Sequence, residues 1–409
     1  MRTFEALSNP TFRRVWTLGI FYYTYRATEL AVLSWFVLTL TGSDLAVALV
    51  GVSRVAPMFL FGLMAGNLAD RFARRRLMLG AQSINLSASL VMVGLLASGH
   101  QVAWMAYLMI FVTGTTWAVD YAARRALLGD IFTGRALSNA TFLDAGLVTG
   151  SNMVGPLVGT TLIRYAGFTG AYMGIALLMV MGLMLVLSIR VSADQARTVS
   201  RGPVGQQLRD AASIMRTNRT VLGAVLLTAA FNFFGFPFVQ LVSVVARDVM
   251  GLQEVAFGLL VSALGFGALV GSAIIASRDT PHKGNYYSLG AALLMVMAVV
   301  FAWAPWYPLA LGAMVVAGLG LAAFAGMQPV IPLEAVTPQE RGRAMGAIAL
   351  GIGAQAPGTF LMGLLAEVLG PQQAITVVTL AGVVSVVVLR RIFPALADAA
   401  DKATAKRSA

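Results

Sequence analysis

Long apolar stretches alternate with short polar junctions along nearly the whole chain. Most stretches hold about eighteen residues or more, enough for a helix to cross a hydrocarbon core about 30 Å thick. None has the alternation of a barrel strand, and backbone groups in lipid must bond to one another, so helices are predicted. Twelve spans are predicted, at residues 14–40, 45–67, 77–98, 102–122, 139–163, 168–189, 220–246, 255–277, 285–303, 307–332, 343–368 and 372–393.

The longest polar stretch separates six spans from six. It covers residues 190–219, is basic and contains Ser, Gly and Pro, as expected of a linker with one surface helix. The predicted fold class is an all-α membrane protein with twelve transmembrane helices in two six-helix bundles, as in a parallel-repeat transporter. The predicted boundaries are 1–190 for the N-terminal bundle, 191–219 for the cytoplasmic linker, 220–394 for the C-terminal bundle and 395–409 for a cytoplasmic tail.

The basic residues follow the topology of these spans. All of the 29 Lys and Arg residues lie at the termini or even-numbered junctions except Arg26, Arg54, Arg164 and Arg247. Because Lys and Arg concentrate in cytoplasmic loops, both termini and every even junction are predicted to lie in the cytoplasm, in a multi-pass protein of the cell (inner) membrane. The net charge of +12 therefore reports topology, and nucleic-acid binding is not expected.

Composition argues against an enzyme. Charged residues are 11% of the chain, against about 25% in ordinary globular proteins, and mean hydropathy is +0.80. None of the three lysines follows a glycine, so the phosphate-binding Gly-Lys-Ser/Thr loop and ATP use are not expected. The chain has no cysteine, and His100 and His282 fall in junctions on opposite sides of the membrane. No catalytic residue, metal site or cofactor is expected, which leaves transport.

Three charged residues are predicted to meet near the middle of the membrane. Arg26 and Glu29 share one face of the first span. Glu29 lies 13 residues before the turn at about residue 42, and Arg54 lies 12 residues after it, so their depths match. Such charges cost about 2.5–3.5 kcal/mol each and tend to be paired or functional. One interpretation is an ion pair that fixes the first two helices. The other is that Glu29 carries protons or that the surplus arginine attracts an anionic cargo.

Asp144 is a second carboxylate inside a predicted span. It lies about a turn and a half from the cytoplasmic end of the fifth span, and its own helix carries no cation nearby. Removal from water disfavours the charged form of a carboxylate, which would suit a proton carrier. A solvated carboxylate near a helix start is the alternative.

The junction "GNLADRFARRR", residues 66–76, places five charges within seven residues between two apolar stretches. Asp70 at a helix end can face the positive N-terminus of another helix, and Arg74 lies one turn further on. Asp120, near the end of the fourth span, is the expected partner of Arg74. The alternative is that the arginines only obey the positive-inside rule.

This junction resembles the motif between helices 2 and 3 of the major facilitator superfamily, with Ala73 where glycine is usual. Further resemblance, at 41–57, 123–142 and 337–350, is to the drug and siderophore exporter branch. The resemblance implies a cytoplasmic gate that closes while the outside is open, formed by Gly66, Asp70, Arg71, Arg74 and Asp120.

The fifth span resembles the Gly-Pro motif of antiporters in that superfamily. Its small residues let helices approach closely, and its proline can bend the helix. Generic tight packing and an exporter-type hinge both remain open. The residues concerned are Gly150, Gly155, Pro156 and Gly159.

The seventh span contains "FNFFGFPFVQ", residues 231–240. The resemblance implies that helices 1, 4, 7 and 10 face a central cavity, where rings and amides would suit an amphipathic solute. Contact with lipid or a neighbouring helix is the alternative. The candidate cargo residues are Asn232, Phe234, Gln240 and Gln328.

The sequence therefore predicts a secondary active transporter that exports small amphipathic organic molecules, of drug or siderophore type, by alternating access in exchange for protons. Its partners are expected to be a small-molecule substrate, protons and the lipid bilayer, and the chain is expected to be a monomer. Uptake of a metabolite or organic anion is the first alternative, and a non-transporting membrane sensor or scaffold is the second.

Overall fold

A computed structural model describes residues 5–132, 134–188, 204–277, 282–337 and 339–393. In this part of the chain all regular structure is helical. The first half contains η1 (Glu5–Ser8), α1 (Pro10–Thr41), α2 (Asp44–Arg71), α3 (Arg74–Ala97), α4 (Ala103–Ile131) and α5 (Gly134–Ser188). The second half contains α6 (Val204–Thr217), α7 (Arg219–Ala230), η3 (Phe231–Gly235), α8 (Phe238–Val244), η4 (Val245–Val249), α9 (Glu254–Ala276), α10 (Lys283–Ala302), α11 (Tyr307–Met327), α12 (Val330–Glu334), α13 (Arg341–Gly353), α14 (Gln355–Leu369) and α15 (Pro371–Ile392).

Every predicted span overlaps a helix. Among the described residues, nine helical segments are long and apolar enough to cross a membrane. One of them, Asn139–Ser188, covers two predicted spans, and Gly167 interrupts it with a non-helical φ of 66°. Helices α1 and α4 have 32 and 29 residues, or about 48 and 43 Å, but they also carry buried charged residues. The number of membrane crossings stays a prediction.

The chain folds into two compact units, each assembled from separate stretches. Unit 1 contains Met1–Gly42, Ser53–Arg201 and Gln253–Ser262, whereas unit 2 contains Ser43–Val52, Gly202–Leu252 and Ala263–Ala409. The first turns of α2 thus belong to unit 2, and the first turns of α9 belong to unit 1. The predicted linker boundary stays a prediction, because residues 189–203 lie outside the described part.

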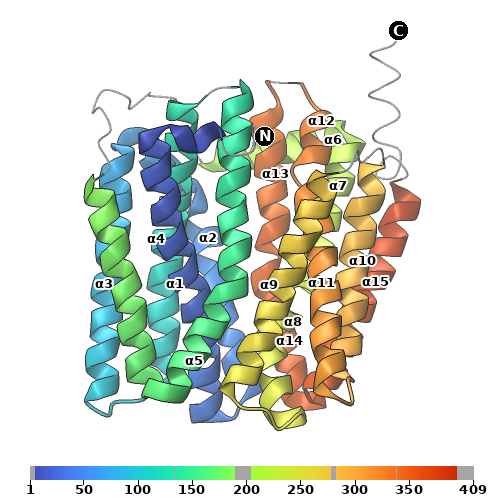
Figure 1. Cartoon of the computed structure of the whole chain (residues 1–409). Helices are drawn as coiled ribbons and strands as arrows, with labels where there is room; N and C mark the ends of the chain where they lie inside the picture. The colour runs from blue at the N-terminus through green and yellow to red at the C-terminus, as the bar shows by residue number, and fades with distance from the viewer. Residues whose placement is uncertain (1–4, 133, 189–203, 278–281, 338, 394–409) are drawn as a thin grey trace. The chain divides into compact units, whose positions relative to one another are not determined.

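In unit 1, α1 packs along α5 and α4, and α3 packs on α4 and α5 (Figure 1). The contact between α1 and α5 is close because of glycine. A Cβ at Gly155 would lie 2.6 Å from the Cβ of Ala27 and 2.8 Å from the backbone nitrogen of Thr28. The hydroxyl of Thr28 donates to the carbonyl of Gly155 at 3.0 Å. Gly159 is similarly crowded by α1, whereas Gly150 has open space and needs no small side chain for packing.

In unit 2, the predicted seventh span is a composite of α7, η3, α8 and η4. The π-helical turn η3 precedes Pro237, which cannot donate to the helix ladder. Phe231 stacks on Phe324 of α11 with ring centroids 3.7 Å apart, and Tyr287 of α10 stacks on the same ring at 4.8 Å. Phe231 therefore belongs to the core of unit 2.

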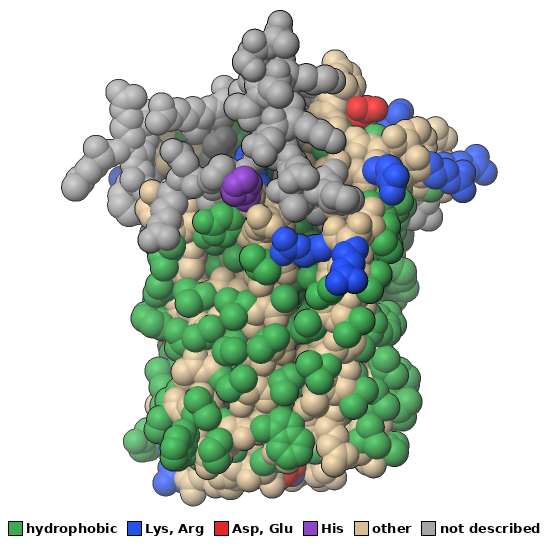
Figure 2. Space-filling model, turned by 90° about the vertical axis from the view of Figure 1, so that its right-hand side faces the viewer, with side chains coloured by type: hydrophobic (Ala, Val, Ile, Leu, Met, Phe, Trp, Pro, Cys, Tyr) green, Lys and Arg blue, Asp and Glu red, His purple; other side chains and the backbone are tan. Residues whose placement is uncertain are grey.

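The surface of the described residues matches a membrane-embedded protein. On the face shown in Figure 2, described apolar side chains cover a broad middle band, and basic side chains gather toward one end. Helix α6 falls in the predicted linker and packs on α13 in the same unit, with Asp210 3.7 Å from Arg343.

Candidate functional site

A fully buried arginine joins three helices of unit 1. Arg124 on α4 is 1% exposed, and its Nε lies 3.4 Å from Oδ2 of Asp120, one turn earlier on the same helix. Its Nη1 lies 3.7 Å from Oδ1 of Asp144 on α5 and donates to the carbonyl of Val15 on α1 at 3.1 Å. The guanidinium also lies over the ring of Tyr23, 5.2 Å from its centroid. We call Arg124, Asp120, Asp144 and Tyr23 the Arg124 network.

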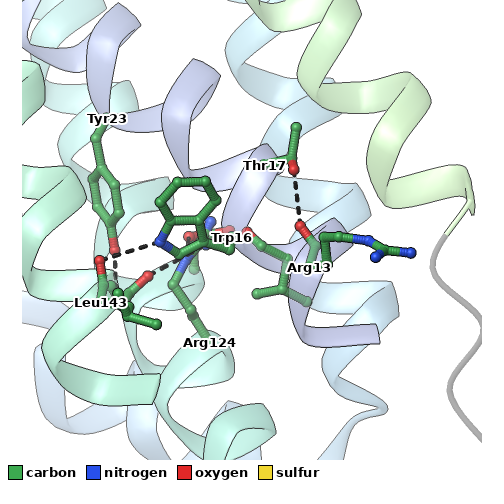
Figure 3. Close-up of polar contacts among 9 residues, drawn as sticks. Arg13, Trp16, Thr17, Tyr23, Arg124 and Leu143 are labelled. Atoms are coloured by element: carbon green, nitrogen blue, oxygen red, sulfur yellow. Dashed lines mark hydrogen bonds and ion pairs between the residues drawn. The ribbon is translucent and has the colours of Figure 1, made fainter. Parts of the chain in front are cut away.

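Helix α1 also contributes two hydrogen-bond donors to this region. The hydroxyl of Tyr23 donates to Oδ2 of Asp144 at 3.2 Å, and Nε1 of Trp16 donates to the carbonyl of Leu143 at 3.3 Å. Figure 3 shows Tyr23, Trp16 and Arg124 converging beside Leu143 of α5. Asp144 is therefore not a lone carboxylate. The cation absent from its own helix comes from α4, and the interpretation of Asp144 as a solvated helix-start residue is wrong.

The charges of the network do not balance. Arg124 supplies one positive charge, and Asp120 and Asp144 supply two negative charges, with both aspartates at most 2% exposed. Removing an uncompensated charge from water into a site this buried costs several kcal/mol of free energy. With both carboxylates ionised, the Arg124 network therefore carries a formal charge of −1.

Arg26, Glu29 and Arg54, which were predicted to cluster near the middle of the membrane, do lie together. They gather around Thr113. The hydroxyl of Thr113 on α4 donates to Oε2 of Glu29 at 2.8 Å, and Nη1 of Arg26 donates to the carbonyl of Thr113 at 3.1 Å. Nη1 of Arg54 donates to the carbonyl of Arg26 at 3.1 Å. Arg26 also lies over the ring of Trp117, 4.6 Å from its centroid.

Of the two interpretations of this cluster, the ion pair that fixes the first two helices is wrong. No ion pair within 4.0 Å joins Glu29 to Arg26 or Arg54, all of which are described residues. The arginines bind backbone carbonyls instead, because each guanidinium reaches an acceptor on its neighbouring helix. Glu29 is 3% exposed and keeps the Thr113 hydroxyl as its hydrogen-bond donor.

The predicted pairing of Arg74 with Asp120 is also wrong. Nε of Arg74 lies 3.5 Å from Oδ2 of Asp130, whereas Asp120 pairs with Arg124. The reason is the length of α4, which continues past residue 122 to Ile131 and brings Asp130 to the start of α3. The side chains of Asp70 and Arg71, and the surroundings of Gly66, lie outside the described part.

Some of the candidate cargo residues of unit 2 already contact other residues of the same unit. Nδ2 of Asn232 donates to the carbonyl of Thr228 at 2.9 Å. Phe234 packs against α15, where a Cβ at Gly382 would lie 2.6 Å from it. Gln240 is buried, and its Oε1 has no hydrogen-bond partner among the described residues. Gln328 is half-buried at the end of α11.

Sequence reasoning missed Arg124, which it counted among the cytoplasmic arginines. The available indication was the spacing Asp120-x3-Arg124, which places opposite charges one turn apart on a helix. It also missed the polar residues of α3, described below. Among the described residues, no group of His, Cys, Asp and Glu could hold a metal ion.

Comparison with known proteins places the chain among membrane transporters. Residues 1–408 match the family described as transmembrane secretion effector. The chain is 20% identical to macrolide efflux protein A of Streptococcus pyogenes over 74% of its length and 76% of the relative. It is 21% identical to the staphyloferrin A transporter of Staphylococcus aureus over 66% of its length and 68% of the relative. The match to the uncharacterized MFS-type transporter YdgK of Bacillus subtilis, 25% identical, spans 40% of this chain and 41% of that protein.

Solved structures share the fold over nearly the whole chain. A bacterial homologue of the human lysosomal transporter Spinster aligns with a TM-score of 0.68 and 14% identity, covering 97% of this chain and 98% of that one. The crystal structure of the human organic anion transporter MFSD10 aligns with a TM-score of 0.65 and 16% identity, covering 93% and 100%. At these identities the comparison shows the fold alone.

Proposed function

The chain belongs to the transmembrane secretion effector family of major facilitator transporters, and from this premise we propose that it exports small amphipathic organic molecules in exchange for protons. As a member of this family it is a multi-pass membrane transporter and not an enzyme. The proposed location is the cell (inner) membrane, with both termini in the cytoplasm. The proposed working form is a monomer that operates by alternating access.

The Arg124 network is the observation that carries the proposal. Two carboxylates and one guanidinium are buried together in a membrane bundle, where ionisable residues usually serve ion or proton movement. Tyr23 of α1 binds Asp144 of α5, so protonation of Asp144 would weaken contacts that join three helices. Proton binding and helix movement are thereby linked in one site.

The relatives support export and the class of cargo. The family description refers to secretion, and one relative is named for macrolide efflux and another for staphyloferrin A transport. A macrolide carries both apolar and polar groups, as the proposed amphipathic cargo does. Asn232, Phe234, Gln240 and Gln328 are proposed to contact such a cargo, because they supply amides and a ring without a net charge.

The remaining candidate residues are proposed to control conformation. The pair of Arg74 with Asp130, together with Gly66, Asp70 and Arg71, is proposed to hold the cytoplasmic gate. The Gly155–Gly159 segment, which includes Pro156, is proposed as the hinge along which α1 moves against α5, because their backbones touch there.

Inverted membrane vesicles provide the test. Vesicles from cells that express the chain are energised so that their interior becomes acidic, and uptake of radiolabelled erythromycin and of an iron siderophore is followed. Export predicts accumulation that a protonophore abolishes, and that Asp144→Asn reduces to the level of vesicles without the chain. Accumulation that persists with the protonophore would contradict proton coupling.

Uptake of an organic anion is favoured by one observation. Arg54 and Arg26 place two guanidinium groups beside the single carboxylate of Glu29. Citrate uptake into intact cells that is lost in Arg54→Gln would support this second candidate over export. Absence of flux for every solute in both vesicle orientations would favour a sensor or scaffold.

A further inference from the structure

A row of buried polar side chains on α3 lies outside the site described so far. Gln82, Asn85 and Ser89 are spaced three and four residues apart, so they share one face of the helix. All three are at most 1% exposed. The hydroxyl of Thr116 on α4 donates to Oδ1 of Asn85 at 2.5 Å, which fixes the row against α4.

Most polar atoms in this row have no hydrogen-bond partner among the described residues. This holds for both amide atoms of Gln82, Nδ2 of Asn85 and the hydroxyl of Ser89. It also holds for the phenol oxygens of Tyr22 and Tyr25, fully buried on α1. Native proteins usually satisfy buried polar atoms of this kind with ordered water, which makes about three hydrogen bonds in such a position.

The polar face of α4 connects this row with both carboxylate sites. Thr113 donates to Glu29, Thr116 follows one turn later and binds Asn85, and Asp120 follows after one further turn. Seven residues of helix separate Thr113 from Asp120, or about 10 Å. Oδ1 of Asp120 also lacks a hydrogen-bond partner among the described residues.

Tyrosines from α1 lie along the same route. The rings of Tyr22 and Tyr25 are 5.5 Å apart, and Arg124 lies over Tyr22, 5.6 Å from its centroid. The amide oxygen of Gln82 would lie 3.6 Å from a Cβ at Gly182 on α5, which places this end of the row between α1, α3 and α5. The polar atoms therefore follow the helix interfaces inside unit 1.

We propose that bound water molecules fill this interface and form a proton path between Glu29 and the Arg124 network. The proposal rests on the proposed proton coupling. At each step one oxygen–hydrogen bond breaks and another forms, so a proton leaving Glu29 arrives on Oδ1 of Asp120 without any other reactant. Titratable and charged groups that face the path are Arg26, Tyr22, Tyr23 and Tyr25 on α1, Arg54 on α2, Arg124 on α4, and Asp144 and Tyr172 on α5.

Radiolytic footprinting tests for the water without any cargo. X-ray pulses split bound water into hydroxyl radicals, which oxidise adjacent side chains even when these are buried. Tyr22 and Tyr25 should be oxidised severalfold faster than Tyr287, which is equally buried but whose hydroxyl binds Thr228 and the carbonyl of Ala224. Equal protection of all three tyrosines would overturn the proposal.

A matched pair of isosteric variants tests the path. Thr116→Val removes a hydroxyl from the path, whereas Thr160→Val removes another buried hydroxyl, which within the described part of the chain binds the backbone of its own helix α5. Thr116→Val should slow proton-driven erythromycin export in proteoliposomes by about tenfold, below the roughly hundredfold effect of a directly positioned proton donor, because water can still bridge. Erythromycin counterflow, which needs no net proton movement, should stay within twofold of wild type in both variants.

The two proposals fail in different ways. If wild-type protein shows proton-driven export and the two variants slow it equally, the proton path is wrong while the proposed function stands. If wild-type protein carries no erythromycin under a proton gradient, the proposed function loses its support, and the footprinting result still decides whether the water is present.

Discussion

Replacement of Arg124 by methionine should strongly destabilise unit 1. The substitution nearly preserves side-chain volume but removes two ion pairs, at 3.4 and 3.7 Å, and the hydrogen bond to the carbonyl of Val15. It leaves Asp120 and Asp144 buried without a cation. Breaking a buried pair by removing one partner costs about 3–5 kcal/mol, since the remaining charge is left uncompensated.

The size of the effect can be measured by thermal unfolding in detergent. For a domain of about 150–250 residues, such as unit 1, each 1 kcal/mol of lost stability lowers Tm by about 2–4 °C. Arg124→Met should therefore lower Tm by roughly 6–20 °C. Fluorescence-detected size-exclusion chromatography after heating gives the midpoint. Arg125→Met is the matched control, because Arg125 is adjacent in sequence but half-buried, and its described contact is with the Tyr121 ring at 5.2 Å.

Two further variants separate charge from geometry. Arg124→Lys keeps the charge but lacks the planar fork that reaches several acceptors, so its Tm should fall between those of wild type and Arg124→Met. Addition of Asp120→Asn and Asp144→Asn to Arg124→Met should recover part of the loss, because the Arg124 network then carries no buried charge. The reasoning is refuted if Arg124→Met melts within about 2 °C of Arg125→Met, a difference below 1 kcal/mol.

Two other predictions concern the packing and gate contacts. Gly155→Val should destabilise the protein by about 1–3 kcal/mol, because the new side chain would displace the α1 backbone, whereas Gly150→Ala should unfold like wild type in the same thermal assay. Asp130→Asn should cost about 1–3 kcal/mol by weakening the contact with Arg74, and the charge swap Arg74→Asp with Asp130→Arg should recover more than half of that loss; failure of the swap variant to recover would mean that the pair contributes little.

The positions of the helices could be predicted from the sequence because lipid imposes one dominant requirement. A helix must present enough apolar residues to cross the bilayer, and apolar stretches of that length stand out along the chain. Hydropathy could not locate helix ends beyond the apolar stretch. Predicted span 4 ends at residue 122, but α4 continues to Ile131, because its last turns, which contain three charged residues, are still helical.

The partners of the buried charges could not be predicted from hydropathy either. Arg124 and Arg125 look alike in sequence, and both fit the positive-inside rule, yet Arg124 is 1% exposed and Arg125 is half-buried over Tyr121. Which arginine turns inward depends on the rotation of α4 against α1 and α5. That rotation is set by tertiary packing, and hydropathy carries no information about it.

Matched depth was a better guide for Arg26, Glu29 and Arg54. Counting residues from the turn between α1 and α2 brought these three to the same region of unit 1. The count could not reveal Thr113, because that residue comes from α4 and is uncharged. Matched depth therefore predicted which residues lie together, and the structure shows which atoms form the contacts.

The most direct test of the account is the number of protons moved for each cargo molecule exported by purified protein in liposomes. An internal pH dye and radiolabelled erythromycin report both fluxes after an imposed pH jump. The account predicts proton and erythromycin fluxes in opposite directions with a fixed ratio in wild type, and loss of both coupled fluxes in Asp144→Asn with counterflow retained. Erythromycin movement that is independent of the pH jump, or an unchanged ratio in Asp144→Asn, would contradict it.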